Sequence, residues 1–241
     1  NDAGTSGVYD VALPADAIVD VLTTLPDGSS VLMQKPPGND IEATRRIFEI
    51  TQQKRMNAAV NFQLRYAPFT NAARKLIEDG VLGDVCDIDI NINVYTPWQL
   101  WTFLYDLPRV EILYHSIHYL DLVRSFFGDP KSIHAKTTKH PSMPQLASVR
   151  TNIIMDYGEL VRANIITNHC HMFGLKKQHG YIKIEGTKGA IYIRPGVLMN
   201  YPEGVTESME YISFVEEDNA QWKPVELEGS WFPHAFIGSM Q

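Results

Sequence analysis

The sequence has few cysteines, no surplus of positive charge and no long apolar run. Its 241 residues include 2 cysteines, Cys86 and Cys170, which lie far apart and form no CxxC pair. A disulfide framework or a structural zinc site is therefore not expected. The chain carries 21 Lys and Arg against 28 Asp and Glu, a formal net charge of -7. With this charge we expect neither nucleic acid nor an anionic membrane surface as a partner.

Two further absences bear on location. No segment approaches the roughly 18 consecutive apolar residues of a membrane-spanning helix, and the N-terminus lacks a basic and then apolar signal pattern. Hydrophobic residues make up 44% of the chain and charged residues 20%, as in an ordinary globular protein. We expect a reduced protein of the cytoplasm.

Apolar strands and helical segments alternate over residues 1–62. Short apolar runs at 8–13, 30–33 and 58–62 predict buried strands, and residues 17–22 between the first two predict a helix. Asp40 is a candidate N-cap for a second helix. The order strand, helix, strand, helix, strand predicts part of a parallel, doubly wound α/β sheet.

A different pattern follows in residues 63–241, which we treat as a second domain of the α+β class. Apolar positions at helical spacing predict helices over 68–79 and 110–127. Apolar and polar residues alternate in several runs, as in strands that are buried on one face. These runs are 85–95, 149–157, 160–167 and 180–185. We expect a large, open and mostly antiparallel sheet with helices on one face.

Several segments resemble one family. Gln34-Lys35-Pro36 resembles a Glu-Lys-Pro segment that closes a dinucleotide-binding domain, and Gly186-Thr187-Lys188-Gly189 resembles a Gly-Thr-x-Gly turn late in a large sheet. Residues 114–121, Tyr-His-Ser-Ile-His-Tyr-Leu-Asp, fall where an Asp-x-Gly-x-His-x-x-Asp helix is expected. Residues 61–68 and 75–85 match the intervening segments. Together they resemble the Gfo/Idh/MocA oxidoreductases, the family of glucose-fructose oxidoreductase and inositol dehydrogenase.

The chain departs from the family pattern in two ways. No GxGxxG loop after a strand is present to bind a pyrophosphate, so we expect most of the N-terminal Rossmann half, and also the C-terminal end, to be missing from the chain. Tyr114 stands where the family carries an aspartate, and Gln34 stands where it carries a glutamate.

The resemblance implies an NAD- or NADP-dependent oxidoreductase that acts on a sugar, polyol or related cyclic alcohol. Hydride transfer from an alcohol needs a base for the hydroxyl proton and a donor for the oxygen. The family's lysine and histidine map to Lys35 and His118, and the phenol of Tyr114 is a third catalytic candidate. The alternative is a non-catalytic relative that binds sugars or acts as a scaffold.

The resemblance also suggests binding residues. Substrate contacts are expected from His115, Asp121, Arg65 and Trp98, and cofactor contacts from Lys35, Pro14 and Pro36. Asp121 either orients an imidazole or forms a helix salt bridge, and Arg65 either lines the cleft or pairs with a carboxylate. Trp98 and its neighbours Trp101 and Tyr105, in a loop-like stretch, either stack on a sugar ring or pack at a subunit interface.

Three interpretations stay open at this point. Glu111, one turn before Tyr114, is a candidate for the missing carboxylate. His169 and His171 share one face of a strand, a spacing compatible with metal ligation, although no recognised metal motif accompanies them and we expect no metal. Relatives commonly assemble through the open sheet, so we expect a homo-oligomer, a dimer or a tetramer.

Overall fold

The computed structural model of the chain describes residues 7–215 and 219–241. These residues form two compact units. The first unit runs to Phe62 and also includes Ser239–Gln241, and the second unit is Gln63–Gly238.

The first unit is built on a parallel sheet with the order β1-β2-β3. The strands β1 (Val8–Val11), β2 (Ser30–Met33) and β3 (Asn57–Val60) alternate along the chain with α1 (Ile18–Thr24) and α2 (Ile41–Gln53). The predicted partial parallel sheet is confirmed. Its strands are in register at their carboxyl ends, where Val11 pairs with Met33 and Met33 with Val60.

Local sequence explains these elements. Asp40 caps α2, because its side chain accepts a hydrogen bond of 2.8 Å from the backbone N–H of Ala43. Apolar residues of the strands and helices then form one core. Its buried members are Val11, Ile18, Leu22, Val31, Met33, Ile47, Ile50 and Met56.

The second unit contains an eight-stranded sheet with the order β11-β10-β9-β8-β4-β7-β6-β5. β4 and β7 are parallel, and the other neighbouring pairs are antiparallel. The predicted large and mostly antiparallel sheet is therefore confirmed. The strands are β4 (Val85–Asn93), β5 (Ser132–Thr138), β6 (Arg150–Asp156), β7 (Arg162–Asn168), β8 (His179–Gly186), β9 (Gly189–Arg194), β10 (Ser208–Ser213) and β11 (Lys223–Pro224).

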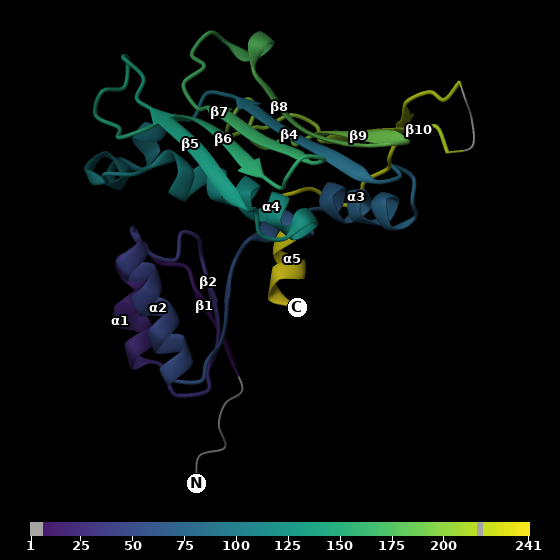
Figure 1. Cartoon of the computed structure of the whole chain (residues 1–241). Coiled ribbons are helices and arrows are strands. Elements are labelled where there is room, and N and C mark those ends of the chain that lie inside the picture. Colours follow the sequence, from purple (N-terminus) through teal and green to yellow (C-terminus); the bar gives the residue numbers. More distant parts are fainter. Residues whose placement is uncertain (1–6, 216–218) are drawn as a thin grey trace. The chain divides into compact units, whose positions relative to one another are not determined.

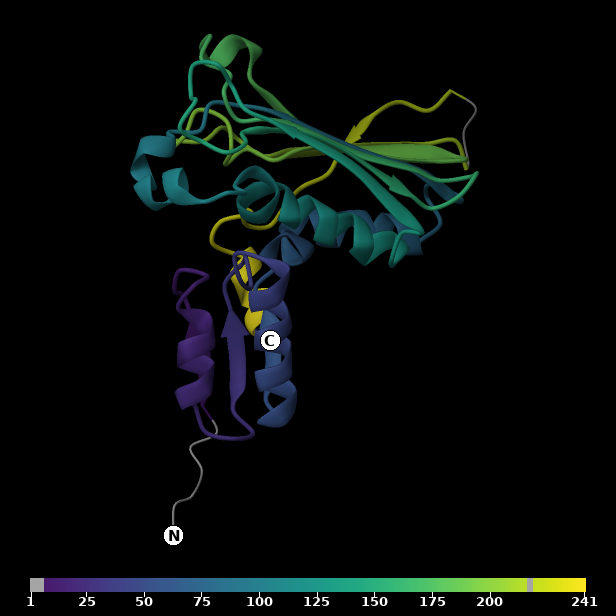
Figure 2. The ribbon, with the colours of Figure 1, turned by 60° about the vertical axis from the view of Figure 1, so that its left-hand side comes forward.

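Helices cover one face of this sheet. α3 (Pro68–Glu78) and α4 (Ile117–Phe127) lie on the same side of it in both Figure 1 and Figure 2. Within the described part of the chain, no α-helix lies on the opposite face. A further helix, α5 (Ala235–Met240), is near the C-terminal end.

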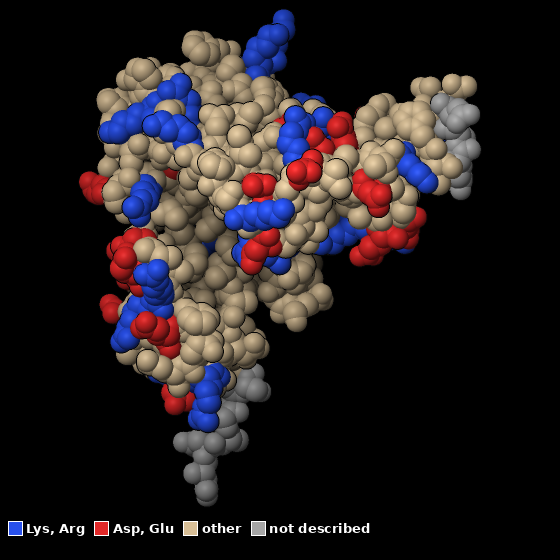
Figure 3. All heavy atoms as spheres, viewed as in Figure 1, with Lys and Arg blue, Asp and Glu red and all other residues tan. Residues whose placement is uncertain are grey.

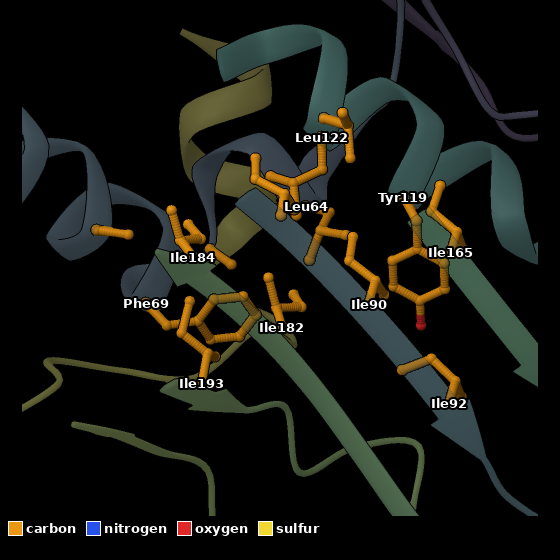
Figure 4. Close-up of a cluster of buried hydrophobic side chains, with 14 of the residues drawn as sticks. Leu64, Phe69, Ile90, Ile92, Tyr119, Leu122, Ile165, Ile182, Ile184 and Ile193 are labelled. Atoms are coloured by element: carbon orange, nitrogen blue, oxygen red, sulfur yellow. The ribbon is translucent and has the colours of Figure 1, made fainter. Parts of the chain in front are cut away.

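The core of the second unit lies between the sheet and its helices (Figure 4). Alternate residues of β4 point into it, which explains the period of two in the sequence. The side chains that Figure 4 labels are Leu64, Phe69, Ile90, Ile92, Tyr119, Leu122, Ile165, Ile182, Ile184 and Ile193. All of them are at most 2% exposed.

Two segments differ from the sequence expectation. Residues 110–127 are not one regular helix, since Ile112–Ser116 is wound as a π-helix before α4 begins. The loop-like stretch before it contains two 3-10 helices, Trp98–Leu100 and Thr102–Asp106. Across residues 7–215 and 219–241, no helix is long and apolar enough to cross a bilayer.

On the face shown in Figure 3, basic and acidic side chains lie among one another.

Candidate active site

The π-helical turn Ile112–Ser116 leads into α4 and carries two of the predicted site residues, Tyr114 and His115. The backbone N–H of Ile117 donates to the carbonyl of Ile112, five residues earlier. In a regular α-helix, residues five apart would lie about 140° apart around the axis. The wide turn brings them closer together. The hydroxyl of Ser116 therefore reaches the carboxylate of Glu111, at 2.8 Å from Oε1 and 3.0 Å from Oε2.

The Glu111 carboxylate is fully buried and is the centre of a polar network. Besides Ser116, it accepts a hydrogen bond from the hydroxyl of Thr151 on β6. The Glu111 backbone N–H donates to Ser148 Oγ at 3.2 Å. His169 Nε2 lies 3.3 Å from Glu111 Oε1, close enough for an ion pair but outside the angles of a directed hydrogen bond. Burial alone raises the pKa of Glu111, but His169, Thr151 and Ser116 outweigh it, so this pKa lies below its usual value.

His169 is held from several sides just after the end of β7. Its Nδ1 lies 3.0 Å from the hydroxyl of Thr96, and its backbone carbonyl accepts a hydrogen bond of 3.3 Å from Trp98 Nε1. The His115 ring lies over the His169 ring, with 4.1 Å between centroids and 39° between planes. Trp98 meets both imidazoles edge-on, at 5.0 Å from His115 and 5.9 Å from His169. These side chains form a buried cluster of imidazoles and indole beside the wide turn.

His118 and Asp121 lie on α4, and Arg65 reaches Asp121 from the 3-10 helix Gln63–Tyr66. His118 is 8% exposed and meets Trp231 edge-on at 6.5 Å. The Asp121 carboxylate is bound by Arg65 through two hydrogen bonds, of 2.5 Å to Nε and 2.6 Å to Nη2. Of the alternatives open for Asp121 and Arg65, the structure shows an ion pair, and the two residues pair with each other.

Tyr114 and Trp98 have contrasting surroundings. The half-buried Tyr114 ring meets Phe103 edge-on at 5.9 Å. Trp98 is only 1% exposed and belongs to a small apolar cluster with Leu104, Val110 and Leu146. Its indole is thus a packed wall of the imidazole cluster.

In the first unit, three polar residues lie at the carboxyl edge of the parallel sheet. Gln34 and Lys35 follow β2, and Asn61 follows β3. Gln34 donates to Asp10 Oδ1 at 3.3 Å and accepts from Asn61 Nδ2 at 3.2 Å. A glutamate at position 34 would place a second carboxylate beside Asp10 and could not donate to it. The neighbouring Asp10 therefore gives a physical reason for the glutamine.

Lys35 and the two prolines occupy the same edge. Burial lowers the pKa of Lys35 to about 8. Pro36 is buried and joined to Lys35 by a cis peptide bond, whereas Pro14 is exposed after β1. Open parallel sheets bind ligands at this edge.

The paired histidines at 169 and 171 have different polar partners. His169 faces Thr96 and Glu111, whereas His171 Nδ1 lies 3.2 Å from Asn93 Nδ2. Among the residues that the structure describes, no group of three or more His, Cys, Asp or Glu side chains could hold a metal ion.

Sequence reasoning missed the hydroxyl members of the network, Thr96, Ser116 and Thr151. No local motif marks them, because they come from three segments that only the sheet brings together. One signal was available at position 116, where a serine stands in place of the glycine of the family pattern. The sequence suggests Glu111 as a substitute carboxylate and His169 as a candidate metal ligand, but it does not indicate that the two side chains are partners.

Comparison with known proteins shows which family the chain resembles in sequence and in fold. The model of the C-terminal alpha/beta domain of the GFO/IDH/MocA oxidoreductase family matches residues 74–230. The uncharacterized protein y4oX of Sinorhizobium fredii is 23% identical over 180 residues, which are 72% of this chain and 49% of that protein. The chain thus spans about half the length of this curated relative.

Solved structures share the fold at low identity. Levoglucosan dehydrogenase, solved with NADH and levoglucosan, superposes with a TM-score of 0.72 and 16% identity, over 95% of this chain and 62% of that one. The aldose-aldose oxidoreductase of Caulobacter crescentus, solved with glycerol, gives 0.72 and 17%, over 92% and 64%. The fold, the matched domain and the order of the segments agree, and the chain belongs to the Gfo/Idh/MocA family of oxidoreductases.

Proposed function

We propose that this chain is part of an NAD- or NADP-dependent oxidoreductase that acts on a hydroxyl carbon of a sugar, polyol or related cyclic alcohol. In this proposal residues 1–62 are the remnant of the dinucleotide-binding domain, and residues 63–241 form the substrate and oligomerisation domain. Membership of an oxidoreductase family and the fold shared with a levoglucosan dehydrogenase support it.

Lys35 is the observation that carries the proposal. An amine whose pKa is about 8 exchanges a proton near neutral pH, unlike an exposed lysine. It follows the central strand of the parallel sheet, at the edge where such sheets bind ligands. Both properties suit a group that contacts a substrate oxygen and relays its proton.

His118 is the second proposed participant. It lies on α4 in the segment that matches the family's active-site helix, and its side chain is largely buried. We assign it acid and base work at the substrate hydroxyl. Tyr114, His115 and the Arg65–Asp121 pair are proposed to line the substrate side, with Tyr114 donating to a substrate oxygen.

In the first unit, the carboxyl edge of the parallel sheet is the proposed position of a nicotinamide ring. Pro14, Lys35 and Pro36 would contact the ring, and Asn61 Oδ1 is a buried acceptor with no hydrogen-bond partner among the described residues. When bound, the ring supplies the site that accepts or donates hydride. The glycine-rich segment for the pyrophosphate is proposed to belong to a part of the protein before Asn1.

Two broader features belong to the same proposal. The face of the eight-stranded sheet opposite α3 and α4 is proposed to join copies of the chain into a dimer or tetramer. A reducing, cytoplasmic location is proposed because Cys86 and Cys170 are both free thiols.

Turnover of a sugar panel by the product of the complete gene tests the proposal, with the absorbance of the reduced nicotinamide as the signal. We expect turnover with at least one sugar or polyol, and a loss on the order of 100-fold or more in His118→Ala. His134→Ala is the matched control, since His134 is exposed on β5. Full activity in a folded His118→Ala variant would overturn the assignment. An inactive protein that still binds sugars would favour the non-catalytic relative.

A further inference from the structure

The proposed reaction leaves unexplained the buried network around Glu111. Glu111, Thr151 and His169 are each at most 1% exposed, so none of them contacts solvent or a substrate. A buried carboxylate is expensive unless donors surround it, and a well-packed apolar side chain often serves stability as well or better. The network therefore calls for a role other than stability alone.

The network holds the wide turn at both of its ends. Glu111 precedes the π-helical segment and Ser116 closes it, and the two side chains are hydrogen-bonded to each other. Thr151 and Ser148 attach Glu111 to the sheet at β6 and just before it. The conformation of residues 112–116 is thus fixed by side-chain contacts to the sheet, and π-helical turns of this kind are frequent at functional sites.

The same network lies against the His115 ring. His169 is located by Thr96 on one ring nitrogen and by Glu111 beside the other. Its ring forms one wall against His115 at 4.1 Å, and the indole edge of Trp98 forms a second wall at 5.0 Å. A side chain held between two walls loses most of its rotamer freedom.

We propose that Glu111 and His169 are positioning residues: they hold the wide turn 112–116 and orient the His115 imidazole for contact with the substrate. The catalytic part of this statement rests on the proposed function. The positional part concerns the second unit alone and stands without it.

Two threonines that face each other on neighbouring strands provide a matched pair of variants. Thr151 on β6 and Thr167 on β7 are register partners, and they are 1% and 2% exposed. The Thr151 hydroxyl donates to Glu111, whereas the Thr167 hydroxyl has no hydrogen-bond partner among the described residues. Threonine to valine keeps the shape at both sites, so Thr151→Val removes a network donor and Thr167→Val serves as its control. Glu111→Gln tests the carboxylate itself.

The first readout is the ring-proton resonance of His115, assigned by its loss in His115→Gln. Neighbouring aromatic rings shift this resonance. We expect Thr151→Val and Glu111→Gln to move it toward the position of an unstacked histidine, and Thr167→Val to leave it in place. An unmoved resonance in a folded Glu111→Gln or Thr151→Val variant would overturn the positioning role, whether or not the protein proves to be an enzyme.

The second readout separates positioning from binding. In the product of the complete gene we expect kcat to fall on the order of 10- to 100-fold in Thr151→Val, at a temperature well below its Tm. The Kd for the reduced dinucleotide should stay within about twofold, because the cofactor residues lie in the first unit and not in the network. Unchanged kcat in Thr151→Val would reject the catalytic part. Absent turnover in the wild type would instead reject the proposed function, while the resonance still decides the positional part.

Discussion

Arg65 and Asp121 join the 3-10 helix Gln63–Tyr66 to α4 through a pair of short hydrogen bonds. The Asp121 side chain is 5% exposed and that of Arg65 is 36% exposed. The carboxylate is therefore the buried partner of the ion pair. This ion pair connects the 3-10 helix at the start of the second unit to α4, the helix that carries His118.

Loss of Arg65 should weaken folding. In Arg65→Ala the buried carboxylate of Asp121 loses its partner, and we expect about 1–3 kcal/mol less unfolding free energy. Water can reach the half-exposed site, so the lower half of this range is expected. Urea unfolding followed by tryptophan fluorescence reports the second unit, where all four tryptophans lie. The control is Lys75→Ala, which breaks the exposed Lys75–Asp79 pair and should cost about 0.5 kcal/mol or less.

The lowered pKa of Lys35 leads to a prediction for the pH dependence of alcohol oxidation. Its pKa of about 8 means that the amine is protonated below this pH and cannot take up a further proton. We expect kcat/KM for oxidation to rise with pH up to about 8, roughly tenfold per unit on the acid side, and then to level off. In Lys35→Arg, which stays protonated, this limb should disappear together with most of the activity. A wild-type profile without a limb near pH 8 would count against Lys35 as the relay.

Single residues could be predicted from the sequence only in part. Lys35, His118 and Gln34 stand in segments with a recognisable pattern, and each lies on the element expected for it. The partners of Glu111 could not be predicted, because Thr96, Thr151 and His169 reach it from separate strand ends. Only the register of β4, β7 and β6 brings these residues together.

At the scale of elements, strands that are buried on one face were the most predictable. β4, β6, β7 and β8 alternate apolar and polar residues, and their predicted ranges agree with the structure to within about two residues. β5 gave no such signal, because it is an edge strand whose first five residues are exposed on both faces. The π-helical turn gave none either, since tertiary contacts of Glu111 and Ser116 fix its winding and local periodicity does not.

The hairpin between β8 and β9 depends on Gly186. A Cβ at this position would lie 2.3 Å from the carbonyl oxygen of Leu82 and 3.0 Å from that of Asp84. Both are backbone atoms, so relieving the contact would require the main chain to shift. We expect Gly186→Ala to lower the unfolding free energy by about 1–3 kcal/mol, measured by urea unfolding.

Gly180 in the same strand is the control for this variant. The nearest atom to a Cβ there is Ile92 Cδ1 at 3.4 Å, an ordinary contact. Gly180→Ala should therefore be within about 0.5 kcal/mol of the wild type, or slightly more stable. Equal stability losses in the two variants would show that the close approach at Gly186 is not the cause.

At the scale of the whole molecule, the open face of the large sheet carries exposed apolar side chains. Ile154 and Ile166, 58% and 39% exposed, lie on it in neighbouring strands. Tyr192 on β9 is 38% exposed on the same face. A broad sheet face that carries apolar side chains among polar ones is compatible with the proposed interface between copies of the chain.

A charge on this face should disrupt the proposed assembly. We expect Ile154→Glu to weaken association about tenfold or more, because the carboxylate would be buried without a partner. Light scattering coupled to size-exclusion chromatography over a concentration series measures this. Ile133→Glu is the control, since Ile133 is 49% exposed and pairs with Met155, on the helix side of the sheet. A wild type that stays monomeric at all concentrations would exclude the proposed interface.

Binding of a reduced nicotinamide dinucleotide tests the central claim most directly. NADH and NADPH are titrated, with their fluorescence as the signal, into this chain and into the product of its complete gene. We predict that the complete product binds at least one of them and that the present chain binds much more weakly, because Lys35, Pro14 and Pro36 supply only the nicotinamide edge of the site. Failure of the complete product to bind either dinucleotide would contradict the proposed oxidoreductase function.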